Sequence, residues 1–596
     1  MINDPGTFLA ALLKTPHLVQ AKPSPNGQWV AWVWQNLSPV GDVFVAPTDG
    51  SAPARRLTDF KESTYVASWS DDSQSLIVKH DRGGDERWQL YQVSVTGGEP
   101  KLVLMEPGGF INAAELSPDE KYLLYGLNQN VYRKNLTSGV ADLLAAPAGV
   151  ITSRPRLNSL GNKIIYTRAD RHPAGRQIWL VNFDGTEDQE ILNFGDQVKV
   201  GASWLPDGER LIFTAETSTH RRVGLYTVAT KAVEWLIDDP ERNIEDAYVP
   251  FGSEQAVIIE LKNATPQCSL LRLDNKTEER ISGPHNLLPL APLADGRWLS
   301  WYYHSEQPAE LVIHEPHTTS LERVVTNVYN YVEYRPEDLV QAENYTWNSV
   351  DGLEIQGWLY RPRVNNGGTV VLVHGGPTYH SENEFDAEIQ YLLARGFTVL
   401  DPNYRGSTGF GLAFQNSIKL SGWGGDEQLD LKFGIEALIK DGVATPGKVG
   451  MMGTSYGGYS SWYAITHWPV NIVAAAVPIC GMTDLVVDYE TTRPDLRGYS
   501  EEMMGGTPAE QSEKYRERSP LHFIQNIKGK LLIVQGQNDP NVTLENLTVA
   551  EAALKQNKIS YETLIFDDEG HGIKKPANVA ELMVKAADFF EQAFKT

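Results

Sequence analysis

Residues 24–301 repeat one short phrase seven times. Each copy is a polar turn of the Ser-Pro-Asp-Gly type, followed by a short apolar strand that ends in an aromatic or apolar residue. Successive copies begin 41 to 47 residues apart, which is the period of a propeller blade of about four strands. The copies are Ser24–Trp32, Ser70–Val78, Ser117–Tyr125, Asn158–Tyr166, Leu205–Phe213, Phe251–Ile259 and Leu293–Trp301.

A second phrase follows most copies, in which a strand rich in branched and aromatic residues meets another polar turn. Examples are Asp42–Gly50, Trp88–Gly98, Gln177–Gly185 and Ser269–Lys276. Alternation of this kind indicates strands rather than helices. A long array of β-sandwiches would also use such strands, but a regular period favours a closed ring, because closure leaves no long exposed edge. We therefore predict an all-β propeller of seven blades.

From about residue 345 the pattern changes to apolar strands that alternate with amphipathic helices. This alternation predicts a doubly wound, mostly parallel sheet with helices on both faces. Strands are expected at 354–360, 369–374, 397–401, 448–453, 472–477, 531–536 and 561–566, and helices near 382–395, 425–440, 544–557 and 578–594. In such a sheet, sites form at the carboxyl ends of the strands.

The stretch from Val449 to Gly458 is an apolar strand that breaks into G-x-S-x-G-G and then into a helix-like segment. This pattern is typical of a nucleophile elbow, in which a serine occupies a sharp strand-to-helix turn between glycines. Ser455 is the candidate nucleophile. Because an isolated match also fits an ordinary turn, the hypothesis requires an acid and then a histidine, each just after a strand.

Both partners follow in that order. Asp539 stands just past the strand at 531–536, and His571 lies between two glycines after the strand at 561–566. A histidine would take the serine proton and return it to the leaving group, while a carboxylate would fix its tautomer. We predict the triad Ser455, Asp539 and His571.

Other carboxylates lie near these positions. Asp484 and Asp488 follow the strand after the elbow and are alternative candidates for the acid. Asp567 and Asp568 precede His571 on its own turn, and we expect them to form a solvated acidic loop.

Two backbone groups are candidates for an oxyanion hole. The N–H of Tyr456 begins the helix after the nucleophile, where the helix dipole favours negative charge. The second donor is expected in the turn His374-Gly375-Gly376-Pro377, as in the H-G-G motif of lipases. Gly376 N–H is our prediction, with Gly375 N–H as the alternative, and His374 is expected to have a structural role.

Composition excludes several other functions. The formal charge is -24 and the pI about 5.0, so binding to nucleic acid or to an anionic membrane is not expected. No apolar run approaches the ~20 residues that span a bilayer, and the start lacks a basic leader region, so a cytoplasmic location is expected. Cys268 and Cys480 form no zinc or disulfide pattern. No metal or organic cofactor is expected, and a homo-oligomer is left open.

The combination of seven repeats with G-T-S-Y-G-G, H-G-G-P and E-G-H-G resembles the prolyl oligopeptidase family. The runs at 403–411 (N-Y-R-G-S-T-G-F-G) and 422–426 (G-W-G-G-D) add to the resemblance, which covers essentially the whole chain. The catalytic half is most similar to the acylaminoacyl peptidase branch. The resemblance implies an N-terminal helical segment at 1–20 that packs on the hydrolase, a propeller at 21–335, and an α/β-hydrolase domain at 336–596. It also implies a propeller that covers the active site and excludes folded proteins.

Membership would also imply substrate contacts. Many members carry an arginine two residues after the catalytic acid, but here Asn541 stands in that place, as in the dipeptidyl peptidases of the family. The glutamate pair with which those enzymes hold a free amino terminus has no convincing counterpart in the sequence. By resemblance an apolar pocket would be lined by Ile479, Met482, Leu485 and Tyr489, positions that a plain hydrophobic core explains equally well.

The function expected from these observations is that of a serine oligopeptidase similar to acylaminoacyl peptidases, acting on short peptides or acylated amino acids. A dipeptidyl peptidase and an amidase or esterase of the same family are the alternatives. A non-catalytic propeller that binds other molecules is the alternative from a different class.

Overall fold

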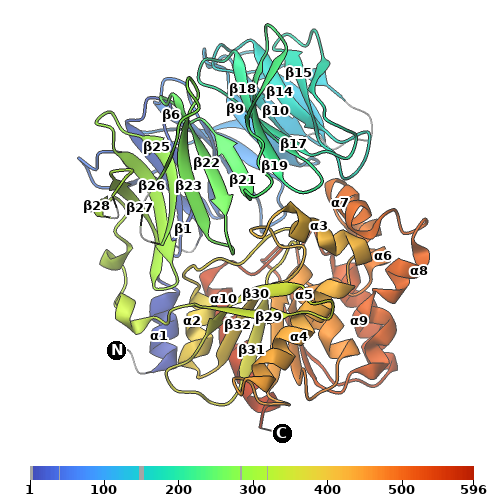
Figure 1. The fold of residues 1–596 in the computed structure, drawn as a ribbon. Helices are drawn as coiled ribbons and strands as arrows, with labels where there is room; N and C mark the ends of the chain where they lie inside the picture. The colour runs from blue at the N-terminus through green and yellow to red at the C-terminus, as the bar shows by residue number, and fades with distance from the viewer. Residues whose placement is uncertain are drawn as a thin grey trace.

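The computed structural model describes residues 4–38, 40–146, 153–281, 283, 285–318 and 320–595. A ring of β-sheets lies over a layered α/β domain, and the chain enters and leaves the ring on the same side of the molecule (Figure 1). The arrangement confirms the predicted fold class of a propeller followed by an α/β-hydrolase.

The described part of the propeller consists of seven four-stranded antiparallel sheets, each built from consecutive strands. Blades 1 to 4 comprise β1–β4 (His17–Pro23, Trp29–Gln35, Asp42–Pro47, Arg55–Arg56), β5–β8 (Thr64–Trp69, Ser75–His80, Gln89–Ser94, Lys101–Met105), β9–β12 (Ile111–Leu116, Tyr122–Leu127, Asn130–Asn135, Ala141–Ala145) and β13–β16 (Ser153–Leu157, Lys163–Arg168, Gln177–Asn182, Gln189–Leu192). Blades 5 to 7 comprise β17–β20 (Val200–Trp204, Arg210–Glu216, Arg221–Thr227, Ala232–Ile237), β21–β24 (Ile244–Tyr248, Gln255–Leu261, Pro266–Arg272, Glu278–Arg280) and β25–β28 (Asn286–Pro292, Trp298–His304, Gln307–His314, Leu321–Val324).

The repeated phrase forms the turn between the first two strands of a blade and the second strand itself. In blades 1 to 3 the leading serine closes the turn, because its Oγ accepts a hydrogen bond from the residue five positions later. The pairs are Ser24 with Trp29 N at 3.0 Å, Ser70 with Ser75 N at 2.9 Å, and Ser117 with Tyr122 N at 3.0 Å. The second phrase becomes the third strand, as in β3 and β15.

Each pair of neighbouring blades shares its own small hydrophobic core. The core between blades 7 and 1 joins Trp32 and Trp34 to Leu299, Leu311 and Ile313. Because each of these two blades uses four consecutive strands, no strand is shared across the closure of the ring. The ring is therefore closed by side-chain packing at this seam.

The α/β domain is built on one eight-stranded sheet in the order β29-β30-β32-β31-β33-β34-β35-β36. Its strands are Glu343–Asn348, Glu354–Tyr360, Thr369–Val373 (β31), Thr398–Asn403 (β32), Val449–Thr454, Ala475–Ile479, Lys530–Gly536 and Glu562–Phe566. The pairs β29·β30 and β30·β32 are antiparallel, and the remaining neighbours are parallel. The candidate catalytic positions after β33, β35 and β36 therefore lie at one edge of the sheet.

Helices cover both faces of this sheet, as the pattern predicts (Figure 1). One core contains side chains from α4, α5 and α9, and the other contains side chains from α1, α2 and α10. The helices are α1 (Pro5–Leu12), α2 (Ala387–Ala394), α3 (Leu412–Ser421), α4 (Asp426–Lys440), α5 (Tyr456–His467), α6 (Leu485–Thr491), α7 (Pro494–Met504), α8 (Ser512–Glu517), α9 (Leu544–Gln556) and α10 (Pro576–Ala593), with 3₁₀ turns η1 (Val328–Asn330), η2 (Pro336–Asp338) and η3 (Pro520–Asn526). Within the described residues, none of these helices has both the length and the apolar character needed to cross a bilayer.

The N-terminal helix α1 belongs to the core of the hydrolase, although the propeller follows it directly in sequence. Phe8 packs edge-on against Tyr334, with ring centroids 6.1 Å apart. The hydroxyl of Thr15, just before β1, lies 2.7 Å from that of Tyr334, which follows β28. The segments that lead into and out of the propeller are thus bound to each other.

Candidate active site

Ser455 occupies the sharp turn between β33 and α5. Its backbone has φ 62° and ψ -117°, a conformation that non-glycine residues rarely adopt and that costs energy unless the surroundings hold it. Its N–H donates to Ile479 O at 2.9 Å, which ties the turn to β34. The elbow is therefore a strained turn fixed by the sheet, as the sequence pattern predicts.

The glycines around Ser455 are required by close backbone packing. A Cβ atom on Gly457 would lie 1.9 Å from Val373 O, and one on Gly453 would lie 2.3 Å from the same oxygen. Both distances are far below any van der Waals contact, so β31 leaves no room for a side chain at either position.

The structure brings Asp539 and His571 together. Asp539 Oδ2 lies 2.8 Å from His571 Nδ1. The other carboxylate oxygen accepts hydrogen bonds from Asn541 N at 2.8 Å and Val542 N at 3.0 Å. Asp539 is only 5% exposed, so both of its oxygens are held in place and one of them faces the imidazole.

The alternative acids have other partners. Asp484 caps α6 by accepting from Val486 N at 2.8 Å. Asp488 is enclosed near Asn546, and burial raises its pKa to about 8. Asp568 binds Lys575 Nζ at 3.0 Å. The carboxylate bonded to His571 is that of Asp539.

The base-bearing loop lies beside the elbow. A Cβ built on Gly572 would be 3.8 Å from Thr454 Cγ2, the side chain just before Ser455. Within the described residues, no hydrogen bond joins Ser455 Oγ to the imidazole. Such bonds commonly tighten only when substrate is bound.

The turn after β31 packs on the nucleophile. A Cβ on Gly375 would be 3.4 Å from Ser455 Cβ, so this turn reaches the place where an oxyanion would form. His374 stacks on Tyr404 with centroids 4.4 Å apart, and its Nε2 lies 2.9 Å from Ser407 Oγ. Burial lowers the pKa of His374 to about 4, which keeps the ring neutral and consistent with a structural role.

Two sequence motifs brace the elbow in ways that the sequence alone did not reveal. In the 422–426 run, Gly424 N and Gly425 N donate to the buried Glu427, which also accepts from Tyr456 OH at 2.9 Å. In the 403–411 run, Tyr404 stacks on Tyr456 with ring centroids 6.1 Å apart, and the neighbouring buried Arg405 pairs with Asp430 at 2.8 Å. Only knowledge of the tertiary contacts connects these residues to the active site.

The residues predicted to contact substrate are in different settings. Asn541 lies two residues from the acid, and its Oδ1 is buried without a hydrogen-bond partner among the described residues. Met482 and Leu485 are buried in the core on one face of the sheet, with Tyr489 packed against it, and Ile479 is buried in the core on the other face. Tyr489 OH also donates to Glu501 Oε1 at 2.6 Å.

Cys480 is a neighbour of the acid and the base that the sequence analysis did not single out. Its Sγ, a carboxylate oxygen of Asp539 and a ring nitrogen of His571 all lie within 4.8 Å of one another. Burial raises the pKa of the thiol to about 12, which disfavours the thiolate form that binds soft metals. Of the contacts among these three residues, the one between Asp539 and His571 is the one that fits a catalytic role.

Comparison with known proteins points to the same chemistry. Residues 383–596 match the model of the prolyl oligopeptidase family. Dipeptidyl aminopeptidase BIII of Pseudoxanthomonas mexicana is 29% identical, over 95% of this chain and 86% of the relative. The acylamino-acid-releasing enzyme of Arabidopsis thaliana is 28% identical over 38% of this chain and 30% of its own length.

The whole architecture also recurs in solved structures. A puromycin-hydrolyzing peptidase of Mycobacterium tuberculosis superposes with a TM-score of 0.83 at 18% identity, covering 98% of this chain and 96% of that one. At this identity the likeness shows a shared fold. The match of residues 383–596 to the prolyl oligopeptidase family and the peptidase relatives indicate that the chain is a serine-type peptidase, whose catalytic domain lies beneath a seven-bladed propeller.

Proposed function

We propose that the protein hydrolyses short peptides through an acyl-enzyme on Ser455, with His571 as the base and Asp539 as its partner. The 2.8 Å contact between Asp539 Oδ2 and His571 Nδ1 is the observation that carries this assignment. Ser455 Oγ attacks the scissile carbonyl carbon while its proton passes to His571 Nε2. The imidazolium then protonates the departing amine as the C–N bond breaks, and water repeats the steps to release the acyl group.

The developing oxyanion would be held by Tyr456 N–H and Gly376 N–H, with Gly375 N–H as the alternative second donor. Among the described residues, none of these N–H groups donates to another protein atom. Tyr456 also begins the twelve-residue helix α5, whose dipole favours negative charge at this end. These observations support a hole made of backbone groups.

The position of the propeller supports a limit on substrate size. It lies over the hydrolase (Figure 1), and residues of both domains line the hollow next to His571. A folded protein would have to displace one domain to reach Ser455. Short, flexible peptides are therefore the proposed substrates.

Within this class we infer that the enzyme releases dipeptides from a free amino terminus. A relative that matches 95% of the chain is named a dipeptidyl aminopeptidase. Asn541 supports the inference, because its buried Oδ1 has no partner among the described residues, which is costly unless a ligand N–H donates to it. Its Nδ2 would donate to the substrate carbonyl one residue before the cleavage-site residue, without the charge of an arginine.

Removal of acylated amino acids is the second candidate. It is favoured by the H-G-G-P turn at 374–377 and by the relative that releases acylamino acids, which matches part of the chain. The two candidates differ in whether the substrate's amino end is charged or blocked.

The test compares kcat/KM for a dipeptide anilide with a free amino group, the same dipeptide acetylated, an acetylated single amino-acid anilide and a nitrophenyl ester. We expect the free dipeptide to be cleaved fastest. Dominant cleavage of the acetylated amino acid would support the second candidate instead. Ser455→Ala should abolish turnover and labelling by a fluorophosphonate, and failure of the folded wild-type protein to label would contradict the proposed site.

A further inference from the structure

A turn of the propeller touches the backbone of the loop that carries His571. Gly84 lies in the connection between β6 and β7 of blade 2. A Cβ on Gly84 would be 2.6 Å from Gly570 N, and one on Gly570 would be 2.2 Å from Gly84 O. Neither position therefore has room for a side chain. Gly570 directly precedes His571, so the propeller backbone rests on the candidate base's own chain.

Asn538 joins this turn to both catalytic loops. Its Nδ2 donates to Gly83 O at 3.0 Å and to Asp567 O at 3.1 Å. Its backbone N–H donates to Glu569 O at 2.9 Å. Because Asn538 directly precedes Asp539, one residue connects the acid, the loop of the base and the propeller.

The turn is held firmly at its base in the propeller. Asp81, which is 8% exposed, accepts from Glu86 N at 3.1 Å. Asp85 Oδ1 accepts from Arg82 N at 3.2 Å and Arg87 N at 3.0 Å. The Glu86 carboxylate in turn pairs with Arg493, at the start of α7. A turn fixed in this way is able to act as a support.

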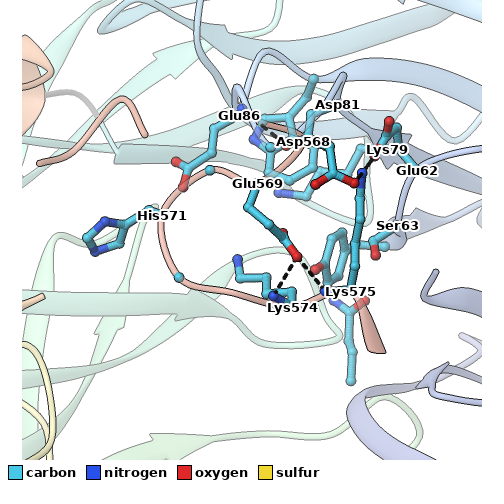
Figure 2. Close-up of a pocket in the computed structure, with 16 residues that line it drawn as sticks. Glu62, Ser63, Lys79, Asp81, Glu86, Asp568, Glu569, His571, Lys574 and Lys575 are labelled. Atoms are coloured by element: carbon cyan, nitrogen blue, oxygen red, sulfur yellow. Dashed lines mark hydrogen bonds and ion pairs between the residues drawn. The ribbon is translucent and has the colours of Figure 1, made fainter. Parts of the chain in front are cut away.

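The His571 loop has a hollow behind it rather than a packed core. A cavity of about 290 Å³ lies between the loop and blade 2, lined by residues that include Gly84, Glu86, Gly570 and Lys574. In Figure 2 the His571 ring points away from the side chains that surround this hollow. Glu569 fixes the far side of the loop by accepting from Lys575 N at 2.8 Å. The near side is held by the propeller turn, by Asn538 and by close packing of Gly536 on Gly570 O.

We propose that Gly84 and Asn538 are positioning residues, through which contact with the propeller sets the place of His571 relative to Asp539 and Ser455. The inference rests on the proposed role of His571 as the base. If the contact is lost, the loop has room to relax into the hollow, and the imidazole moves from the line between acid and nucleophile. Neither residue needs to touch substrate for this effect, so turnover would fall more than substrate binding.

The first test compares Gly84→Ala with Gly97→Ala. Both glycines belong to turns of blade 2 and have similar left-handed φ angles, +80° and +87°, but a Cβ on Gly97 would meet no atom within 4 Å. The two variants share the conformational strain of alanine at positive φ and differ in the contact with Gly570. Displacement of a catalytic group by about 1 Å costs on the order of 100-fold. We expect kcat of Gly84→Ala to fall about 10- to 100-fold with little change in KM, and that of Gly97→Ala to stay near wild type.

A spectroscopic signature separates positioning from general damage. The proton on His571 Nδ1 that bonds Asp539 gives a strongly deshielded proton resonance, which Asp539→Ala should abolish and so identify. In Gly84→Ala this resonance should shift or broaden, while in Gly97→Ala it should match wild type. Equal resonances and equal kcat in the two glycine variants would overturn the proposal.

Asn538→Ala provides a second route if Gly84→Ala does not fold. It should lower kcat in the same range and shift the same resonance. In the double variant Gly84→Ala/Asn538→Ala the combined loss should be smaller than the product of the single losses, since both changes release the same contact. Full kcat in Asn538→Ala, or fully multiplicative losses, would contradict the inference.

His571→Ala distinguishes this inference from the proposed function. If His571→Ala is inactive while Gly84→Ala and Asn538→Ala behave like wild type, the triad stands and only the positioning role fails. If His571→Ala keeps its activity, the assignment of the base itself is wrong.

Discussion

The propeller and the hydrolase bury their apolar side chains in different ways. Among the residues that the structure describes, the propeller has a separate core of 7 to 10 buried residues at each of its seven seams. In the same described part of the chain, the hydrolase has two large cores of 36 and 32 buried residues, one on each face of a continuous sheet. Damage at one seam is therefore expected to stay local, whereas damage in the sheet spreads through the domain that carries the triad. The triad, which needs precise geometry, therefore lies in the domain that is built on one continuous sheet.

The largest expected effect concerns chemistry in the hydrolase. Asp539→Asn keeps the shape of the side chain but loses the charge and favours the wrong histidine tautomer. We expect kcat to fall by about 10⁴-fold, with the thermal transition of the propeller unchanged. Steady-state kinetics together with circular dichroism measure both. A loss of less than tenfold would show that another group holds His571.

The next effect separates the two kinds of core directly. Leu311 at the seam of blades 7 and 1 and Leu400 in β32 are both fully buried. Each change to alanine should cost about 2 to 5 kcal/mol. Hydrogen exchange should show Leu311→Ala opening mainly blades 7 and 1, whereas Leu400→Ala should raise exchange across the whole hydrolase sheet. Equally widespread hydrogen exchange in both variants would contradict the difference between the seam cores of the propeller and the continuous cores of the hydrolase.

A smaller effect is expected where the two regions meet. Lys199 of blade 5 and Lys419 of α3 each lie 2.6 Å from Glu502 Oε1, whose side chain is 1% exposed. Lys199→Ala removes a charged hydrogen bond and should lower stability by about 1.5 to 3 kcal/mol. Lys419 remains to pair the buried carboxylate, which limits the loss.

This contact should also depend on pH. Burial would raise the pKa of Glu502, but the two lysines outweigh burial and leave the pKa below its ordinary value of 4.5. A carboxyl whose pKa is lowered by folding adds stability above that ordinary value and loses it as the pH falls through the folded value. The difference between wild type and Lys199→Ala should therefore be full at pH 7 and shrink below pH 4.5. A constant difference between pH 7 and pH 3 would contradict this account.

The smallest effect is expected on the hydrolase surface, at the exposed pair of Lys555 and Glu551 on α9, 3.0 Å apart. Lys555→Ala should leave the melting temperature unchanged, because water and salt screen such pairs. It serves as the matched control for Lys199→Ala, and a comparable loss in both variants would remove the special role of the buried contact.

Much of this arrangement was predictable from the sequence because it repeats or follows local rules. Turns such as the one closed by Ser70 indicated the blades, and the order of serine, acid and histidine, each just after a strand, led to the contact between Asp539 and His571. The boundaries of α2 were less accurate, since Asp386 caps the helix four residues after its expected start. Local patterns thus predicted elements and their order well.

Contacts between distant segments were beyond reach. Asn538 bonds Gly83 across 455 positions, and Lys199 bonds Glu502 across 303. Neither residue stands in a recognisable pattern, since the choice of an asparagine or a lysine depends on what the other domain presents. For the same reason, the sequence does not reveal that Glu427 supports the helix after Ser455, because this contact forms only when two loops meet.

The bond between Thr15 and Tyr334 defines how the two domains are able to move. The chain crosses between them twice, and both crossings pass through this one point beside α1. Any rotation of the propeller relative to the hydrolase must pivot about that double crossing. The widest gap would then open on the opposite side, where Lys199 meets Glu502 and Arg221 meets Gln415. A peptide that enters by such a movement would reach Ser455 from the side of α3 and α7.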